Sequence, residues 1–288
     1  MNEEGKQFWV KLHFKTETGI KNLTTEEADQ YKVTDPDYAT RDLFEHIEKG
    51  GEAGWRVCAQ IMPYEDAWTY RFNPFDVTKI WPHKDYPLVQ FGRMVLNRNP
   101  SNYHAEVEQS AFSPATLVPG IEPSPDKMLQ GRLFSYPDTQ RYRLGGNYLQ
   151  LKINCPYRAR LNNYQRDGVL SNGQGGSSLN YEPNSFGGPT AKPDAKIAPF
   201  ELKGVVGQYN HNHPNDDFVQ PGNLYRHVLG PAERTRLVNN LSGAMKPVKR
   251  EDVKIRAIRN FYRADPEFGI RIAQNLGLDV SKVRLGNL

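Results

Sequence analysis

The stretch from Gly168 to Gly222 constrains the fold of this chain most, because it is rich in glycine, serine, asparagine and proline and has no sustained hydrophobic period. An unstructured loop of this length is uncommon inside a compact domain. Aromatic residues lie within it or just before it, among them Tyr164, Tyr181, Phe186 and Phe200. Aromatic anchors favour an arm that lies over another protein surface, with a disordered segment as the alternative.

The part of the chain before this stretch has the alternation of β-strands. In residues 7–14, one apolar set (Phe8, Val10, Leu12 and Phe14) alternates with a second set (Trp9, Lys11 and His13). This period of two predicts a strand with the first set on a buried face. Further strands are predicted at residues 55–62, 68–72 and 88–97, and helices at residues 24–31, capped by Thr24, and 38–48. Antiparallel strands with inserted helices are typical of part of a barrel or sandwich.

The part after the stretch has helical periodicity instead. Residues 231–278 contain three apolar stripes at helical spacing, formed by Leu237, Val238 and Leu241, by Val253, Ala257, Ile258 and Phe261, and by Phe268, Ile272 and Leu276. Such stripes predict a small helical unit that packs on something larger. They are ordinary core positions and indicate no ligand.

Charge and composition exclude several classes of protein. The 37 basic and 33 acidic residues give a net charge of +4, with no block of like charges, so nothing favours nucleic acid as a partner. The chain has no apolar run long enough for a membrane span, and the N-terminal MNEEGKQFW is not a signal peptide. Cys58 and Cys155 match no metal spacing, and free thiols are favoured over a disulfide. These features predict a soluble, cytoplasmic protein.

One segment carries residues suited to chemistry. SPDKMLQGRLFSYPDTQRYR is predicted to form a helix that starts at Pro125, with Ser124 as its N-cap. At about 100° per residue, one sector of about 120° then contains Met128, Arg132, Tyr136, Gln140 and Arg143. A face of thioether, guanidinium, phenol and amide groups is a poor core face and a good cofactor face.

Tyr136 is the most informative member of this face. A free phenol is neutral at pH 7, and a nearby cation favours its ionised form. Arg132 precedes Tyr136 by four residues, a spacing at which helical side chains meet, and a ferric iron would complete the ionisation. Spacing alone leaves a plainer alternative open, with two surface arginines and a half-buried aromatic residue. Pro137 also predicts a bend at this point of the helix.

The segment around Tyr136, RLFSYPDTQRYRLGGNYLQL, closely resembles the proximal-haem signature of the haem catalases. Similar segments cover most of the chain: FNPFDVTKIWPHKDYPL (72–88), VLNRNPSNYHAEVEQSAFSPATLVPGIEPSPDKMLQGR (95–132), NCPYRARLNNYQRDG (154–168) and the C-terminal FYRADPEFG. The resemblance implies a tyrosine-ligated haem protein of the small-subunit type, which converts hydrogen peroxide to water and oxygen and protects against oxidative stress.

The resemblance also implies a fold and an assembly. The fold class is α+β, with the C-terminal half of an antiparallel β-barrel in residues 1–100. A wrapping arm with the haem-ligating helix follows in residues 101–222, and a C-terminal helical domain in residues 223–288. The family implies a homotetramer in which the arm threads between subunits, with no nucleic-acid or membrane partner.

Site residues are carried over by position. Tyr136 is expected to be the axial ligand of a haem b iron, Arg132 to hold it as phenolate, and Arg143 to meet a haem propionate. Met128 and Phe112 are expected to line the haem pocket. A second set (Lys15, Trp81 and His83) falls where some family members contact NADPH, which makes NADPH a possible second cofactor. Gln140 stands where other members often carry a histidine.

The family's peroxide chemistry also needs a distal histidine and a distal asparagine. The sequence has seven histidines, and none of them lies in the family's distal motif. They are His13, His46, His83, His104, His211, His213 and His227. The resemblance therefore implies a C-terminal portion without catalytic residues of its own, inactive by itself. A non-enzymatic haem-binding or oligomerisation module derived from a catalase is the alternative. A loop metal site in HNHPNDD (211–217) is the weaker interpretation of that segment, and a solvated turn is favoured.

Overall fold

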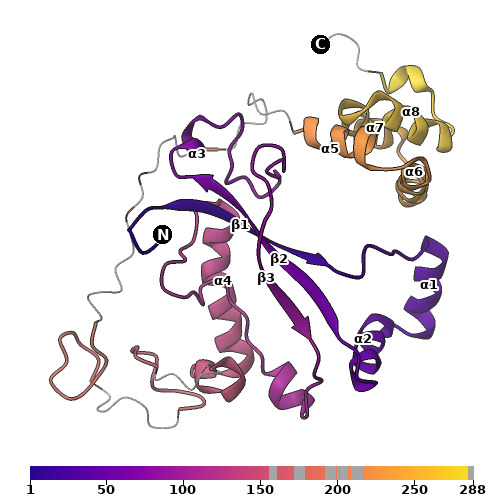
Figure 1. The fold of residues 1–288 in the computed structure, drawn as a ribbon. Coiled ribbons are helices and arrows are strands. Elements are labelled where there is room, and N and C mark those ends of the chain that lie inside the picture. The colour runs from indigo at the N-terminus through magenta and orange to yellow at the C-terminus, as the bar shows by residue number, and fades with distance from the viewer. Residues whose placement is uncertain are drawn as a thin grey trace. The chain divides into compact units, whose positions relative to one another are not determined.

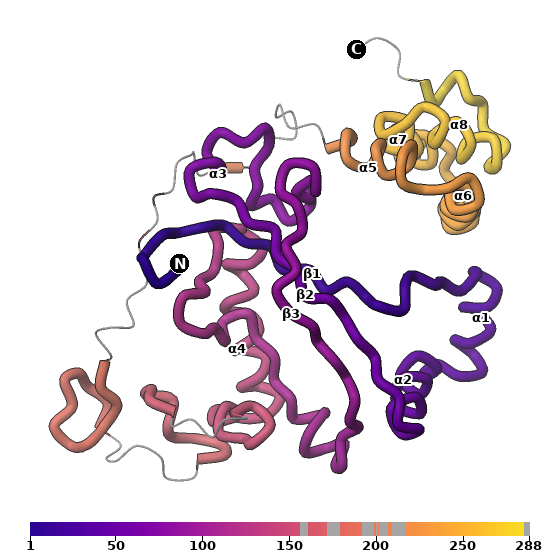
Figure 2. The backbone as a smooth tube through the Cα atoms, in the orientation of Figure 1, coloured from indigo at the N-terminus to yellow at the C-terminus, as the bar shows by residue number. Residues whose placement is uncertain are grey.

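A computed structural model describes residues 1–155, 161–171, 179–191, 199, 201, 207–208 and 217–284. The chain divides into two compact units (Figures 1 and 2). The first unit comprises Met1–Lys21 and Asp37–Val205, and the second comprises Asn22–Pro36 and Val206–Leu288. One antiparallel sheet and several separate helices make up these units, which confirms the α+β class.

The sheet of the first unit has three strands in the order β1-β2-β3. They are β1 (Phe8–Thr16), β2 (Ala53–Pro63) and β3 (Val89–Leu96), and each neighbouring pair is antiparallel. A register shift between Val57 and Cys58 interrupts the β2–β3 ladder. Three of the four predicted strands are therefore confirmed.

The remaining predicted strand, at residues 68–72, is wrong. Asp66–Thr69 forms the short helix α3, and Trp68 packs edge-on against Trp9 and Tyr64, with ring centroids 6.4 and 6.0 Å apart. The alternating aromatic residues of this segment reflect burial in an aromatic cluster. They do not reflect strand pairing.

The apolar alternation of β1 predicts the wrong buried face. Val10, Leu12 and Phe14 are 52, 55 and 53% exposed, whereas Trp9 on the opposite face is 9% exposed. That opposite face carries the core of the unit, formed by Trp9, Met62, Ala67 and Trp81 with Tyr64, Trp68, Tyr70, Phe72, Phe75 and Tyr86 around them. An apolar side chain is buried only where other chain covers it, so alternation alone does not identify the core side.

The segment between β2 and β3 is fixed to the sheet by buried polar contacts. Gln60 is 1% exposed and donates to the carbonyls of Trp81 (2.9 Å) and Tyr86 (2.6 Å). Lys11 Nζ donates to the carbonyl of Lys79 at 3.1 Å and lies 4.8 Å from the ring centroid of Trp81. These bonds satisfy backbone groups that lack a strand partner.

Two helices precede β2. Helix α1 (Thr25–Thr34) begins with a capping box in which Thr24 and Glu27 exchange hydrogen bonds, which confirms the predicted cap. Helix α2 (Tyr38–Glu48) ends before Gly50, whose φ of 82° is the left-handed conformation that glycine tolerates.

Helix α4 (Lys127–Leu144) is the longest helix of the first unit described by the structure. Its N-cap is Asp126, which accepts from the amides of Met128 (2.8 Å) and Leu129 (3.1 Å), so the predicted Ser124 cap is wrong. Ser124 instead accepts from the amide of Asp126 and lies two residues before the N-cap. Pro137 lies inside the helix, which continues to Leu144. Short turns flank α4, namely η1 (His104–Glu108), η2 (Tyr148–Gln150) and η3 (Lys152–Asn154).

The second unit is helical, as predicted for residues 231–278. It contains α5 (Val219–Asn223), η4 (Leu224–Val228), α6 (Pro231–Met245), α7 (Glu251–Ala264), α8 (Pro266–Asn275) and η5 (Val280–Lys282). Its core includes residues of all three predicted stripes, namely Val238, Ile258, Phe268 and Ile272. Helix α1 joins this unit through a 2.8 Å hydrogen bond between Thr25 and Asn240.

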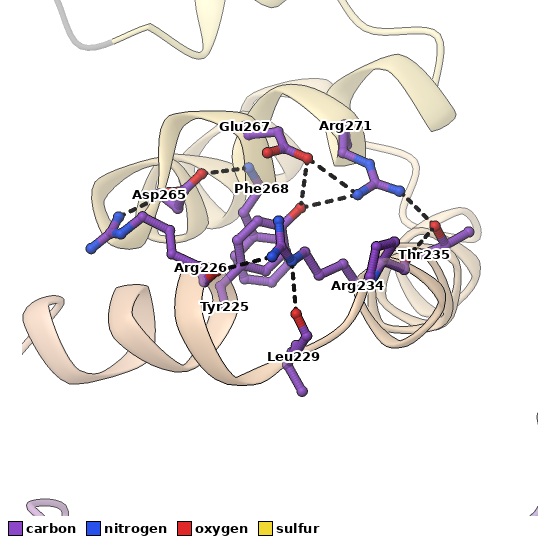
Figure 3. A network of polar contacts seen from close by, with 10 residues as sticks. Tyr225, Arg226, Leu229, Arg234, Thr235, Asp265, Glu267, Phe268 and Arg271 are labelled. Carbon is purple, nitrogen blue, oxygen red and sulfur yellow. Dashed lines mark hydrogen bonds and ion pairs between the residues drawn. The ribbon is translucent and has the colours of Figure 1, made fainter.

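A polar network ties the helices of the second unit together (Figure 3). Arg226 pairs with Asp265 at 2.8 Å, and Asp265 also caps α8 by accepting from the amide of Phe268. Arg271 donates to Tyr225 Oη at 3.2 Å and to Thr235 at 2.8 Å. The buried Tyr225 hydroxyl therefore has partners, as a buried polar group requires.

Within the described residues, no helix is long and apolar enough to cross a membrane. Cys58 is buried and Cys155 is half-buried, and both are thiols, as predicted.

Candidate functional site

Arg132 and Tyr136 meet on one face of α4. Arg132 Nη2 donates to Tyr136 Oη at 3.0 Å, and the guanidinium carbon lies 5.1 Å from the centroid of the phenol ring. The spacing of four residues brings the two side chains together, as helix geometry requires. Tyr136 is half-buried, so part of its side chain remains accessible while Arg132 bonds its oxygen.

Arg143 lies further along α4 and is held by several acceptors. Its Nε and Nη2 donate to Gln140 Oε1 at 3.0 and 2.6 Å, Nη2 donates to the carbonyl of Ser110 at 2.9 Å, and Nη1 donates to that of Glu108. These contacts use four of the five N–H groups of a guanidinium, which leaves one on Nη1 for an anionic ligand.

The two residues expected to line a pocket expose apolar side chains. Phe112 is 81% exposed and Met128 is 57% exposed. The carbonyl of Phe112 accepts from Gln140 Nε2 at 3.1 Å, so its backbone lies beside α4, one turn beyond Tyr136. Gln140 is 7% exposed and contacts both Phe112 and Arg143, a link that the sequence did not indicate.

This donor set fits a ferric porphyrin. A phenol with an arginine on its oxygen suits a hard, positively charged iron, and a second arginine with one spare N–H suits a carboxylate edge. Uncovered phenylalanine and methionine side chains suit an apolar macrocycle. The residues of α4 and its neighbouring segment therefore suit each part of haem.

The start of α4 lies in the electrostatic field of the sheet. Burial lowers the pKa of Lys11 on β1, while the negative charges of Asp126 and Asp76 act in the opposite direction. Asp126 is also the N-cap of α4. The N-cap carboxylate of α4 and the Lys11 cation on the sheet therefore interact through their charges.

The end of α4 is also fixed. Gly145 follows the helix with a φ of 124°, where a Cβ would lie 2.8 Å from the side chain of Val169. Asn147 is 1% exposed and donates to the carbonyls of Asp167 (3.3 Å) and Val169 (3.0 Å). The segment around residue 168 therefore packs directly on the C-terminal end of the helix.

The second predicted set of site residues lies around one face of β1. The ring of His83 lies 5.9 Å from that of His13, and His13 Nε2 lies 2.8 Å from Gln60 Oε1. Lys15 follows His13 by two residues and shares its face of the strand. Trp81 is 3% exposed and its indole N–H donates to the carbonyl of Pro74, so the indole nitrogen is already used.

The segment HNHPNDD lies outside the described residues except for Asp217. Within the described part of the chain, no group of three or more His, Cys, Asp or Glu side chains is placed to hold a metal ion.

Comparison with known proteins gives consistent matches along the chain. The sequence model of the catalase family matches residues 1–188, and a model described as catalase-related immune-responsive matches residues 211–276. Catalase-A of Dictyostelium discoideum is 59% identical over 286 residues, which cover 98% of this chain and 58% of that protein. The catalase of Methanosarcina barkeri is 50% identical and covers 100% of this chain and 57% of that protein.

The fold is similar to solved catalase structures. Catalase A from Saccharomyces cerevisiae matches with a TM-score of 0.85 and 40% sequence identity, over 96% of this chain and 58% of that chain. A bacterial catalase matches with a TM-score of 0.83 and 39% identity. The chain thus spans a little more than half the length of the relatives it matches.

Proposed function

The chain belongs to the catalase family, and we propose that it forms the haem-ligating portion of a haem catalase that converts hydrogen peroxide to water and oxygen. The observation that carries this proposal is the 3.0 Å hydrogen bond from Arg132 to the phenolic oxygen of Tyr136. A tyrosinate ligand needs a cation that stabilises its negative charge, and this bond joins Tyr136 to such a cation.

Each residue of the site has a separate role in this proposal. Tyr136 binds the iron through its oxygen, and Arg132 stabilises negative charge on that oxygen through a charge-assisted hydrogen bond. Arg143 uses its remaining N–H to pair with a propionate. Met128 and Phe112 pack against the macrocycle. Haem b, when bound, supplies the iron that exchanges electrons with peroxide.

The uncovered sheet face supports the finer fold proposal, half of an antiparallel barrel. Val10, Leu12 and Phe14 are exposed apolar neighbours on β1, and Ile61 and Val89 are also exposed, at 43 and 50%. The interior of a closed barrel is lined by such alternate side chains. We propose that this face is the barrel interior, that residues 101–222 form an arm, and that the protein assembles as a homotetramer.

A nicotinamide nucleotide is the proposed second ligand, held by Lys15, Trp81 and His83. Lys15 and the imidazoles of His13 and His83 offer polar contacts on one face of β1. Because the indole N–H of Trp81 donates to Pro74, Trp81 contributes through its ring edge or its backbone. NADPH fits this combination of a cation and flat rings.

In this proposal, no residue of this chain is assigned as the base that transfers a proton. Peroxide cleavage in this family needs a distal base that moves a proton between the two oxygens. Tyr136 would bind the iron and Arg132 would stabilise charge on its oxygen, and neither is assigned the proton transfer. We therefore propose that the 288-residue chain loaded with hemin evolves little oxygen by itself.

A chimaera tests the proposed activity. This chain would replace the matching part of Dictyostelium Catalase-A, to which it is 59% identical, so that the relative supplies the part that the chain does not cover. The expected result is oxygen release from hydrogen peroxide by the chimaera and little release by the chain alone. A chimaera that retains haem but releases no oxygen contradicts the catalase proposal and favours a non-enzymatic haem-binding module.

A further inference from the structure

Residues 108–112, which run from the last residue of η1 to Phe112, have their backbone held by side chains of α4 and η3. The carbonyls of Glu108 and Ser110 accept from Arg143, and that of Phe112 accepts from Gln140 at 3.1 Å. Both donors lie on α4. The α4 helix thus supplies partners to alternate carbonyls of this segment, in which residues 109–112 belong to no strand or helix.

Asn154 supplies the remaining contacts. Its Oδ1 accepts from the amide of Ala111 at 2.8 Å, and its Nδ2 donates to the carbonyls of Gln109 (3.0 Å) and Tyr148 (3.1 Å). One amide side chain therefore bridges the segment to η2 and satisfies both a donor and an acceptor within it. Its role is the same as that of Gln140, which accepts from Arg143 and donates to Phe112.

These contacts hold the backbone of a residue whose side chain is not held. Phe112 is 81% exposed, although its own carbonyl and that of Ser110 both accept hydrogen bonds. Ordering an irregular segment costs conformational entropy, which three polar side chains offset here. The result is an exposed apolar side chain on a hydrogen-bonded backbone beside the face of α4 that bears Tyr136.

We propose that Gln140 and Asn154 are positioning residues for the haem site: they fix segment 108–112 so that Phe112 and Arg143 contact the macrocycle and its propionate. This inference rests on the proposed function, because it assigns the haem as the ligand of Phe112. Neither residue touches the haem. Asn154 acts through the backbone of Gln109 and Ala111. Gln140 acts through both the carbonyl of Phe112 and the guanidinium of Arg143.

The test measures hemin dissociation from the 288-residue chain into an excess of a haem-scavenging protein. Asn154→Leu and Gln140→Leu are each expected to accelerate hemin loss about tenfold, the effect of removing a buried hydrogen-bond partner. Asn147→Leu is the matched control, because Asn147 is also a buried asparagine that bonds loop carbonyls, but on residues 167 and 169. The control is expected to leave hemin loss unchanged.

A double-mutant cycle separates positioning from general destabilisation. If Asn154 acts through Phe112, Phe112→Ala with Asn154→Leu loses hemin no faster than Phe112→Ala alone. Additive effects, or equal effects of Asn154→Leu and the Asn147 control, overturn the proposal. If the wild-type chain takes up no hemin, the proposed function fails together with the positioning proposal. If the wild type binds hemin and the variants lose it no faster, only the positioning proposal fails.

Milder variants keep the test open if the leucine substitutions do not fold. Gln140→Glu retains an acceptor for Arg143 and loses the donor to Phe112, and Asn154→Asp retains the acceptor for Ala111 and loses the donors to Gln109 and Tyr148. Both are expected to increase amide exchange of residues 109–112 and hemin loss together. Faster exchange without faster hemin loss overturns the proposed link to the haem.

Discussion

Arg132 and Tyr136 lie one helical turn apart on α4, and the guanidinium of Arg132 donates a 3.0 Å hydrogen bond to the phenolic oxygen of Tyr136. A permanent positive charge at this distance stabilises negative charge on the oxygen. A single helix therefore carries both a potential iron ligand and the group that prepares it. Further along α4, Gln140 and Arg143 donate to the carbonyls of Phe112 and Ser110.

Replacing Arg132 tests whether the cation prepares the ligand. Arg132→Ala is expected to weaken ferric haem binding by about tenfold or more, because a charge-assisted hydrogen bond to the ligating oxygen is lost. Arg141→Ala is the control, since Arg141 lies on the same helix and donates to Gln165 instead. Hemin titrations of the three proteins measure the effect, and equal affinities contradict the assigned role.

The N-cap of α4 is expected to contribute measurably to stability. Asp126→Ala removes the acceptor for the amides of Met128 and Leu129 and should lower the free energy of unfolding by about 1 kcal/mol. Ser124→Ala, at the cap position that the sequence predicts, should change it less. Urea denaturation of both variants decides between the two caps, and a larger loss for Ser124→Ala contradicts the structure.

Acid should weaken the first unit through Asp85. A hydrogen bond from Tyr70, with further contributions from Arg71, holds the pKa of Asp85 below its ordinary value. A carboxylate with a depressed folded-state pKa stabilises the fold above the ordinary aspartate value of about 3.9, and this contribution is lost as the pH falls through the lower folded value.

Asp85→Asn is therefore expected to lower the free energy of unfolding at pH 6 and to make less difference at pH 3. Denaturant unfolding at the two pH values measures this. Asp42→Asn, at an exposed position of α2, is the control. A stability deficit of Asp85→Asn that grows as the pH falls contradicts the assigned pairing.

Two helical glycines of the second unit should respond to alanine with opposite signs. A Cβ at Gly269 of α8 would lie 2.6 Å from Tyr262 Cβ on α7, so Gly269→Ala should destabilise the unit by roughly 1–3 kcal/mol. A Cβ at Gly243 of α6 meets nothing within 4 Å, so Gly243→Ala should stabilise it by about 0.5–1 kcal/mol. Thermal unfolding of both variants tests the packing of α7 on α8, and a shared sign contradicts it.

Local signals in the sequence predict much of the fold. The Thr24 capping box, the alternation in residues 7–14 and the spacing of Arg132 and Tyr136 each depend on residues a few positions apart, and the structure contains each of these features. The resemblance around Tyr136 supplies what spacing alone does not, namely the identity of the ligand.

Features that depend on distant parts of the chain are not predicted. Which face of β1 is exposed depends on the side that the aromatic cluster covers. The alternation around Trp68 indicates a strand, whereas Trp68 lies in helix α3 and joins that cluster. Gln140 bonds Phe112 across 28 residues, and Asn154 bonds Ala111 across 43. No periodicity or short motif in the sequence encodes such pairings.

The spectrum of the hemin-loaded chain with and without the phenolic oxygen of Tyr136 tests the central claim most directly. Tyr142→Phe is the matched control, because Tyr142 is 96% exposed on the same helix. Wild type and Tyr142→Phe are expected to show the absorption and the phenolate vibrations of a ferric tyrosinate, and Tyr136→Phe is expected to lose both together with most of its haem. An unchanged spectrum for Tyr136→Phe would remove Tyr136 as the iron ligand.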